Sequence, residues 1–262
     1  MIKAAVLGSP IAHSLSPLLH RAAYTHLGVS GDYQAIEVKL NELKPFLEKS
    51  LAQDYSGFSL TMPLKEEVIN IVGDIDPLAR EIASANTVVN RNGHWVASST
   101  DLLAFTRLLQ GLSFTSVCVI GGGGTARAAL GALRAFTENV DVLLRSPERL
   151  GALIQAGGRI DVKALEMSSD LSSYDLVIST VPAGVINLQD LVDTQPQGVL
   201  LDVLYHPWPT PLAAKWRESG QPVISGRDLL VEQALDQISL MTGNVFDYEQ
   251  MRKVLYTALL EV

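Results

Sequence analysis

A lysine and an aspartate in the first half of the chain are placed where they could move a proton. Lys65 follows the apolar run Gly57 to Thr61, and Asp101 begins a helical pattern after Ser98-Ser-Thr. Ligands of α/β sheets bind beyond the carboxyl ends of the strands, so both side chains are expected to face one site. A lysine and a carboxylate held together can bind a substrate hydroxyl and transfer its proton. Each residue also has a plainer interpretation, Lys65 as a surface charge and Asp101 as a helix N-cap.

Two hydroxyl groups near the start of the chain suggest an anion site. Ser14 and Ser16 lie directly before Pro17 and an apolar helical stretch that ends at Gly28. Ser16 is expected to cap the helix that begins at Pro17. Two hydroxyls beside a helix N-terminus also make a small site for an anion, and a carboxylate fits that description.

A glycine-rich segment in the second half predicts a nucleotide site. Gly121-Gly-Gly-Gly-Thr-Ala-Arg127 follows a buried strand pattern and opens a helix. Glycines let the backbone approach a pyrophosphate, and the helix N-terminus offers free N–H groups. The alternative is a glycine-rich turn that binds nothing. The residues expected to contact the cofactor here are Gly121, Gly122, Gly123, Gly124 and Thr125.

The residues after the next strand indicate which dinucleotide would bind. An NAD site has an acidic residue at this point, whereas this chain has Arg145-Ser-Pro-Glu-Arg149. Arg145, Ser146 and Arg149 suit a 2′-phosphate, which arginine can bind through two hydrogen bonds. NADP is therefore the predicted cofactor, with ordinary surface charge at a helix start as the alternative.

Strand and helix patterns alternate along the chain, which predicts an α/β fold with largely parallel sheets covered on both faces. The alternation restarts at Val117, and the helix from Asp101 to Gln110 is the expected joint between two domains. Two helical stretches, 229–241 and 247–261, follow the last strand and are expected to return to the first sheet. We predict a substrate domain of residues 1–101 plus 231–262 and a Rossmann-type NADP domain of residues 102–230.

Composition excludes several classes of protein. The 262 residues carry a net charge of −8 with no basic block, which argues against a nucleic-acid partner. No apolar run reaches the ~20 residues of a membrane helix, and no export signal is recognisable. A single cysteine, Cys118, allows no disulfide within the chain, and the five histidines lack metal-ligand spacing. A cytoplasmic protein without membrane attachment or bound metal is expected.

These stretches together resemble the shikimate dehydrogenase family along essentially the whole chain. Gly8 to His20 matches its G-x-P-I-x-H-S-x-S-P-x-x-H signature without a gap, and Gly57 to Lys65 matches G-x-N-V-T-x-P-x-K with two changes. Further similarities are Ala85 to Thr87, Thr100-Asp101, Gly121 to Arg127, Arg145-Ser146, Asp202 to Tyr205 with Thr210-Pro211, and Gly226 with Gln233-Ala234.

The resemblance implies an NADP-dependent enzyme that interconverts 3-dehydroshikimate and shikimate on the way to chorismate and the aromatic amino acids. It implies that Ser14 and Ser16 bind the substrate carboxylate, and that Lys65 and Asp101 act at the ring hydroxyl, with Lys65 accepting its proton in oxidation. By position, the remaining substrate contacts would be Thr61, Asn86, Tyr205 and Gln233, and the nicotinamide contacts would be Val203, Gly226 and Leu229. A monomer or a homodimer is expected.

Several positions depart from the family's motifs. Ser59 and Ser99 stand where the family has asparagine, Ala97 replaces a usual glycine, and Leu144 replaces the asparagine of its N-R-T phosphate motif. Two alternatives therefore stay open. One is a quinate/shikimate dehydrogenase that uses NAD, and the other is a non-catalytic NADP-binding relative. Ser14 and the two arginines oppose the first, and the Lys65/Asp101 pair opposes the second.

Overall fold

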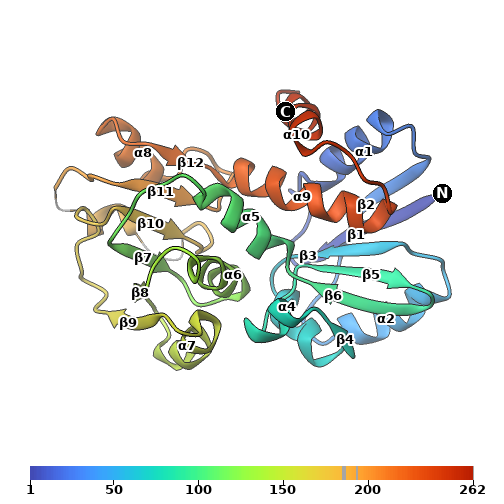
Figure 1. Ribbon diagram of the computed structural model, residues 1–262, viewed down its shortest axis with the longest axis horizontal. Coiled ribbons are helices and arrows are strands. Elements are labelled where there is room, and N and C mark those ends of the chain that lie inside the picture. The colour runs from blue at the N-terminus through green and yellow to red at the C-terminus, as the bar shows by residue number, and fades with distance from the viewer. Residues whose placement is uncertain (185–186, 193, 262) are drawn as a thin grey trace. The chain divides into compact units, whose positions relative to one another are not determined.

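The chain divides into two compact units, shown in the ribbon of a computed structural model (Figure 1). The structure describes residues 1–184, 187–192 and 194–261. Unit 1 comprises Met1–Ala104 and Leu230–Val262, and unit 2 comprises Phe105–Leu229. The chain passes from one unit to the other within helices α5 (Thr100–Leu109) and α9 (Gly226–Thr242).

Unit 1 is built on a mixed sheet of six strands in the order β2-β1-β3-β5-β6-β4. β1 pairs in parallel with β2 and β3, and β4 with β6, whereas β5 is antiparallel to both β3 and β6. The expected parallel pairing therefore dominates, with β5 as the exception. The strands are β1 (Ile2–Gly8), β2 (Gly31–Glu37), β3 (Gly57–Leu60), β4 (Asp74–Ile75), β5 (Thr87–Arg91) and β6 (His94–Ser98).

The β5–β6 hairpin was not predicted, although the sequence carries a signal for it. Asn92 and Gly93 form the two-residue turn between Arg91 and His94, and both have positive φ, 54° and 85°. An Asn-Gly pair between apolar runs is a strong hairpin signal because both residues tolerate that conformation. The hairpin reverses the chain, so β5 begins and β6 ends at the sheet edge where β1 and β3 end.

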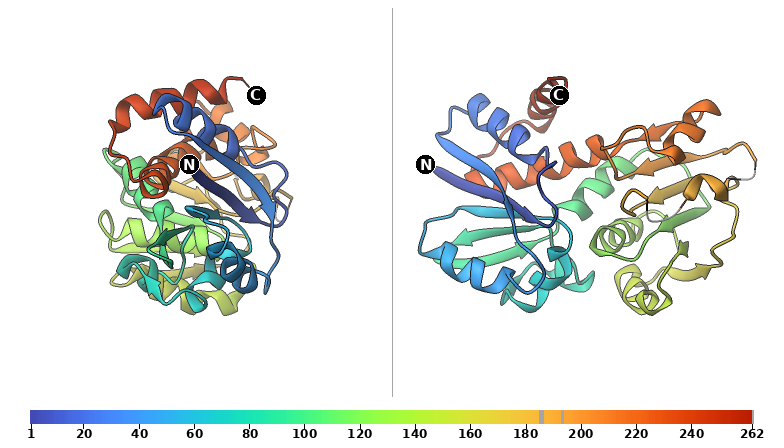
Figure 2. Two further views of the ribbon diagram at one scale, coloured as in Figure 1. Left: turned by 90° about the vertical axis from the view of Figure 1, so that its right-hand side faces the viewer. Right: turned by 180° about the vertical axis from the view of Figure 1, so that it is seen from behind.

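Helices cover both faces of this sheet. Side chains of one face, including Leu7, Phe58 and Val88, pack against α2 (Leu43–Leu51), α3 (Leu64–Glu67), the 3-10 turn η1 (Val68–Asn70) and α4 (Pro77–Glu81). The other face, including Val6 and Val89, meets Tyr24 of α1 (Ser16–His26) and Met241 of α9. α10 (Tyr248–Leu259) lies beside α1, as Figure 2 shows, and both pack with α9 in one apolar cluster. The two C-terminal helices thus return to the first sheet as expected.

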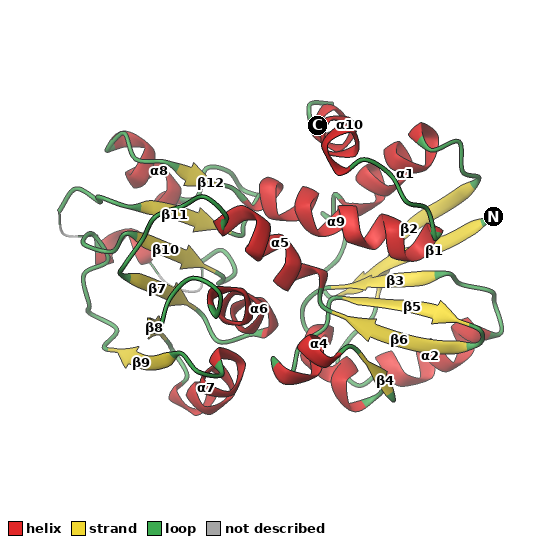
Figure 3. Ribbon diagram, in the orientation of Figure 1, coloured by secondary structure: helices red, strands yellow, loops and turns green. Residues whose placement is uncertain are grey.

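Unit 2 contains a wholly parallel six-stranded sheet in the order β12-β11-β10-β7-β8-β9, drawn in yellow in Figure 3. Its strands are β7 (Val117–Ile120), β8 (Asn139–Leu143), β9 (Asp161–Leu165), β10 (Leu176–Ser179), β11 (Val199–Asp202) and β12 (Val223–Ile224). The order changes direction at β7, so the carboxyl end of β7 is the switch point at which such sheets bind ligands. The helical elements are α6 (Gly124–Leu133), η2 (Pro147–Arg149), α7 (Leu150–Gly157), η3 (Leu188–Leu191) and α8 (Pro211–Glu218).

Neither a membrane-crossing helix nor a metal-binding cluster is found among the described residues. No helix in that part of the chain is both long and apolar enough to cross a membrane. No group of three or more His, Cys, Asp or Glu side chains there could hold a metal ion.

Candidate active site

Lys65 and Asp101 meet at the edge of the unit 1 sheet where β3 and β6 end. The Lys65 ammonium lies 2.6 Å from Asp101 Oδ2, and the two side chains are only 16% and 6% exposed. Lys65 comes from α3 and Asp101 from the first turn of α5. Water screens a pair of this burial poorly, so its attraction is stronger than that of a surface pair. Lys65 is therefore not a free surface charge, and Asp101 uses its carboxylate for the lysine rather than as an N-cap.

Asn86 holds the pair in place from the start of β5. Its Oδ1 accepts hydrogen bonds from the backbone N–H groups of Thr100 (2.7 Å) and Asp101 (3.3 Å), which are among the donors that the first turn of α5 leaves unpaired. Its Nδ2 donates to Asp101 Oδ1 at 2.9 Å. One buried amide thus fixes both the backbone and the carboxylate of Asp101, while the Lys65 carbonyl accepts from the N–H of Ala85 at 2.9 Å.

Ser99 explains one of the departures from the family's motifs. Its Oγ accepts from the N–H of Leu102 at 3.4 Å, so it caps the same helix end. Serine and asparagine are both good N-caps, and the exchange therefore keeps α5 in place.

Ser14 and Ser16 lie together at the start of α1, but their roles differ from the expectation. The helix begins at Ser16 with Leu15 as N-cap, so Ser16 does not cap it, and that prediction was wrong. Instead Ser14 Oγ accepts from the N–H of Ser16 at 3.3 Å. The helix begins one residue earlier than predicted, and Pro17 at its second position has no N–H that needs a partner. Ser14 is half-buried and Ser16 is buried.

The remaining predicted substrate residues divide between the units. Gln233, on the unit 1 part of α9, accepts from Asn86 Nδ2 at 3.3 Å and so joins the Lys65–Asp101 group. Thr61 is half-buried directly after β3, where its N–H donates to the Leu7 carbonyl at 2.9 Å. Gly8 allows this approach, since a Cβ there would overlap the Thr61 methyl. Tyr205 lies in unit 2 beyond β11 and is half-buried.

A second glutamine, not predicted from the sequence, reaches the same site. Gln237 is fully buried one turn after Gln233, and its Nε2 donates to Thr87 Oγ1 at 3.0 Å and to the Asn86 carbonyl at 3.3 Å. Its Oε1 accepts from Ser59 Oγ at 2.6 Å. The signal available was the spacing of four residues, which puts both glutamines on one face of a helix.

In unit 2, the glycine loop is shaped as a nucleotide site requires. Gly121 follows β7 with φ +109°, and a Cβ there would overlap Thr180 Oγ1. Gly123 is the N-cap of α6, and a Cβ at Gly122 would press on the Arg149 side chain at 3.0 Å. Within the described residues, the N–H groups of Gly122 and Gly123 have no acceptor. The loop therefore leaves amides at a helix N-terminus, where they can bind a phosphate. Gly124 and Thr125 form the first turn of α6.

Arg145, Ser146 and Arg149 follow β8, next to this loop. Arg145 and Arg149 are exposed, and Arg149 Nη1 donates to the Gly122 carbonyl at 3.2 Å. Arg149 therefore lies beside the glycine loop, where its guanidinium group could bind the 2′-phosphate of a dinucleotide held by that loop. Leu144 is buried and adds no polar group there.

The predicted nicotinamide residues also gather within unit 2. Gly226 N–H donates to the Leu204 carbonyl at 3.1 Å, and a Cβ at Gly226 would overlap the Val203 carbonyl. Glycine is thus needed for α9 to begin against the chain that follows β11. Val203 is half-buried and Leu229 is buried.

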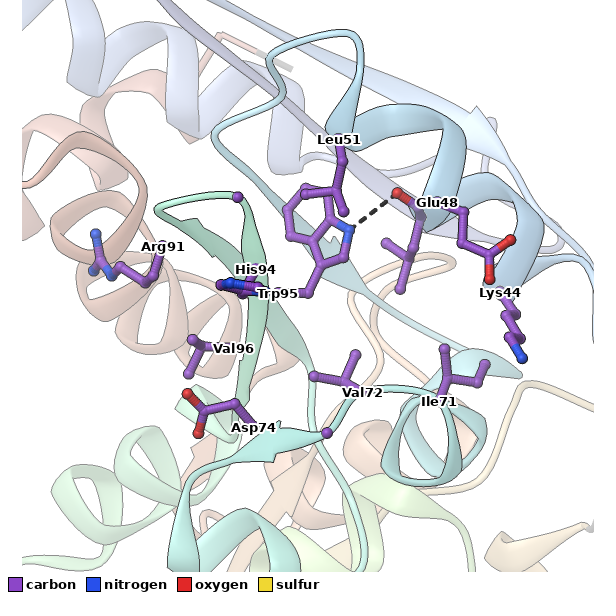
Figure 4. A pocket seen from close by; sticks show the side chains of 13 residues that line it. Lys44, Glu48, Leu51, Ile71, Val72, Asp74, Arg91, His94, Trp95 and Val96 are labelled. Atoms are coloured by element: carbon purple, nitrogen blue, oxygen red, sulfur yellow. Dashed lines mark hydrogen bonds between the residues drawn. The ribbon is translucent and has the colours of Figure 1, made fainter.

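A hollow in unit 1 lies away from all these residues. Figure 4 shows its lining of α2 and β5–β6 hairpin side chains, and its volume is about 390 Å³. Trp95 closes one wall and donates to the Leu47 carbonyl at 3.0 Å. The hairpin turn is at the opposite end of β5 and β6 from Thr87 and Ser98, so this hollow does not belong to the Lys65 site.

Comparisons with known proteins agree with the family resemblance of the sequence. Residues 6–88 match the family model of the shikimate dehydrogenase substrate binding domain. A shikimate dehydrogenase (NADP(+)) from Bacillus cereus is 31% identical over 97% of this chain and 97% of its own length.

Two solved structures resemble the fold closely. Shikimate dehydrogenase of Mycobacterium tuberculosis has a TM-score of 0.86 at 34% identity, covering 98% of this chain and 99% of that one. The shikimate 5-dehydrogenase of Thermus thermophilus in complex with NADP(H) and shikimate has a TM-score of 0.83 at 30% identity, covering 98% and 100%.

Proposed function

This chain belongs to the shikimate dehydrogenase family, and we propose on that premise that it interconverts 3-dehydroshikimate and shikimate with NADP as cofactor. It is an oxidoreductase of chorismate and aromatic amino acid biosynthesis. The observation that carries the proposal is the buried Lys65–Asp101 pair, 2.6 Å apart and held by Asn86. A protein that only binds NADP has no need of such a pair.

Unit 1 is proposed to bind the substrate. Ser14 and Ser16 bind its carboxylate at the start of α1, where hydroxyls and a helix N-terminus favour an anion. Thr61, Asn86 and Gln233 bind the ring hydroxyls together with Lys65 and Asp101. Tyr205, which belongs to unit 2, stays a predicted substrate contact.

Unit 2 is proposed to bind NADP, and its residues fit the group. The amides of Gly122, Gly123, Gly124 and Thr125 at the start of α6 bind the pyrophosphate, because a helix N-terminus favours an anion. Gly121 shapes the loop beneath it, since its own N–H donates to the Leu143 carbonyl at 3.0 Å. Arg145, Ser146 and Arg149 bind the 2′-phosphate, and Val203, Gly226 and Leu229 lie along the nicotinamide. When bound, NADP supplies the hydride chemistry.

The protein's own contribution is to orient the substrate and to manage one proton. In the reduction of 3-dehydroshikimate, Lys65 donates a proton to the carbonyl oxygen as the ring carbon receives the hydride. In oxidation, Lys65 takes the hydroxyl proton back. Asp101 orients the lysine and accepts a hydrogen bond from the same hydroxyl. Since Asn86 fixes Asp101 in advance, little reorganisation is needed when the substrate binds.

The same proposal includes the setting of the reaction. Cys118 is buried and without a disulfide partner in the described chain, which suits the cytoplasm. We infer a monomer or homodimer that acts on a small molecule, with neither nucleic acid nor membrane as partner.

Initial rates with shikimate and with quinate, each paired with NADP and with NAD, test this function. We expect shikimate with NADP to give the highest kcat/KM. A clear preference for quinate with NAD would replace the proposal by the quinate alternative. Binding of NADP without turnover of either acid would show a non-catalytic relative.

A further inference from the structure

Gln237 is the centre of a buried hydrogen-bond chain that ends at Asn86 and Thr87, and Asn86 in turn bonds Asp101. Tyr33 OH donates to Ser59 Oγ at 2.5 Å, and Ser59 Oγ donates to Gln237 Oε1 at 2.6 Å. The Gln237 amide then donates to Thr87 Oγ1 and to the Asn86 carbonyl. Every donor in this hydrogen-bond chain has an acceptor, so the orientation of the Gln237 amide is fixed.

The sheet register explains why these groups meet. Ser59 on β3 is directly opposite Thr87 on β5, so their side chains point to the same face of the sheet. The neighbouring Phe58 and Val88 belong to the core on the other face. Ser59 and Thr87 therefore face α9, and Gln237 reaches both from that helix.

The end of this hydrogen-bond chain at Tyr33 is buried and uncharged. Tyr33 stacks on His20 with ring centroids 3.9 Å apart, and both rings are fully buried. Burial outweighs the effect of the neighbouring Gln237 amide and lowers the pKa of His20 to about 3, so the imidazole is neutral. Burial also raises the pKa of Tyr33, which keeps its hydroxyl protonated and able to donate.

Ser59 stands where the family's G-x-N-V-T-x-P-x-K motif has an asparagine. Serine lacks the amide group, and the Gln237 carbonyl oxygen lies 2.6 Å from its hydroxyl, where a longer side chain at position 59 would extend. We propose that Gln237 supplies from α9 the amide that Ser59 lacks on β3, and that it is a positioning residue for Asn86 and, through Asn86, for Asp101. Ser59 and Gln237 then form a complementary pair. An asparagine at position 59 does not fit beside Gln237, and a residue without an amide at position 237 leaves Ser59 without its acceptor. This inference rests on the proposed function.

A double-mutant cycle tests the pairing. Ser59→Asn places a second amide against Gln237, and Gln237→Ala leaves Ser59 and Thr87 without their partner, so each change should lower kcat about tenfold or more. Interaction energies between contacting residues commonly correspond to several-fold to a hundredfold effects. The double variant should recover kcat to within a few-fold of the wild type. The Kd for NADP should stay unchanged throughout. Singles whose effects simply multiply in the double variant would overturn the pairing.

A third variant separates positioning from filling of space. Gln237→Met keeps the length of the side chain but makes no hydrogen bonds, so its kcat should fall as in Gln237→Ala. Wild-type kcat in Gln237→Met would show that Gln237 only fills space. Gln250→Ala, at an exposed position on α10, is the matched control and should behave as the wild type.

The cycle also gives an answer that does not depend on the reaction. If the wild type fails to oxidise shikimate, the proposed function fails, but urea unfolding midpoints of the same variants still measure the Ser59–Gln237 coupling. Recovery of the midpoint in the double variant would support the pair, and additive losses would overturn it. Should Ser59→Asn not fold alone, folding of the double variant is itself the recovery, and its failure to fold counts against the pair.

Discussion

In unit 1 the side chains around Lys65 and Asp101 are largely buried and hydrogen-bonded to one another, whereas in unit 2 the proposed phosphate-binding groups are backbone amides and exposed arginines. Asp101 illustrates the first case, with its side chain 6% exposed and bonded to both Lys65 and Asn86. The Gly122 and Gly123 amides and Arg145 illustrate the second. Proton transfer needs reacting atoms held closely, which a side-chain network provides before substrate arrives. Binding of phosphate needs accessible donors and a backbone without obstruction.

The difference has a consequence for substitutions. Removing a side chain from the unit 1 network should lower both turnover and stability, because its partners stay buried without it. Removing Arg145 or Arg149 from unit 2 should alter mainly the affinity for the cofactor, since both side chains are exposed and little buried structure depends on them.

The largest effect is expected from Lys65→Ala. Loss of the proton donor should lower kcat about 100- to 10,000-fold, as is usual for a general acid or base. The Asp101 carboxylate would also lose its partner, so the melting temperature should fall. The Kd for NADP should be unchanged. Steady-state kinetics, thermal unfolding and a cofactor titration measure the three quantities.

Lys44→Ala is the matched control for Lys65. Lys44 is an exposed lysine of the same unit, on α2 beside the hollow of Figure 4, and its loss should leave kcat unchanged. Near-normal turnover in Lys65→Ala would remove this lysine from the mechanism and the unit 1 network from catalysis.

Arg145→Ala/Arg149→Ala is expected to have the next largest effect. Loss of both guanidinium groups should raise the Kd for NADP roughly 10- to 100-fold, equivalent to about 1–3 kcal/mol, and leave the Kd for NAD nearly unchanged. The melting temperature should hardly change, because both side chains are exposed. Fluorescence titration with the two cofactors measures this. Arg159→Ala, another exposed arginine of unit 2, serves as control.

Equal losses for NADP and NAD would show that the arginines do not recognise the 2′-phosphate. A large drop in melting temperature would contradict the contrast between the units, since these arginines would then be structural.

As the pH is lowered, the stability of unit 1 should begin to fall at a higher pH than that of unit 2. The pKa of His20 is about 3 in the folded chain and 6.5 as its ordinary value, so unfolding takes up a proton between these limits. The contribution of His20 to the free energy of unfolding is therefore fully present above pH 6.5. It decreases as the pH drops, by roughly 2 kcal/mol at pH 5. In unit 2, hydrogen bonds from Thr115 and Ser116 lower the pKa of Asp175 to about 2, so its contribution is lost only below pH 3.8, its ordinary value.

Urea unfolding at pH 7.5 and pH 5 tests this, with His20→Phe compared to the wild type. The variant keeps an aromatic ring against Tyr33 but cannot take up the proton, so it should lose about 2 kcal/mol less between the two pH values. His26→Gln, an exposed position of the same helix, should show the wild-type difference. An equal loss in His20→Phe would mean that this imidazole is charged in the folded chain.

The sequence predicted those features that local pattern determines. Alternating strand and helix patterns gave the α/β class, and the glycine loop was placed between a strand and a helix, as it is between β7 and α6. The short elements β4, α4 and β9 were missed, because two to five residues carry too little periodicity.

The candidate site was predicted as residues but not as a network. Lys65 and Asp101 were identified from their places after strands, and the structure joins them. Gln237 was not identified, since nothing near it in the chain indicates that Ser59, 178 positions away, is its partner. Contacts between distant segments depend on strand register and helix packing, which one sequence does not specify position by position.

The backbone side of the comparison is tested by the smallest change, Gly121→Ala. One methyl group at φ +109° is strained and overlaps Thr180 Oγ1, so the loop must shift. Such strain costs about 1–3 kcal/mol, and we expect the Kd for NADP and for NAD to rise together, about tenfold. Because the pyrophosphate is common to both cofactors, discrimination between them should persist, unlike in the arginine variant. Gly151→Ala is the control, since a Cβ there meets nothing within 4 Å and alanine favours α7. Unchanged affinity in Gly121→Ala would show that the shape of this loop does not govern cofactor binding, and the contrast between a side-chain site and a backbone site would then fail.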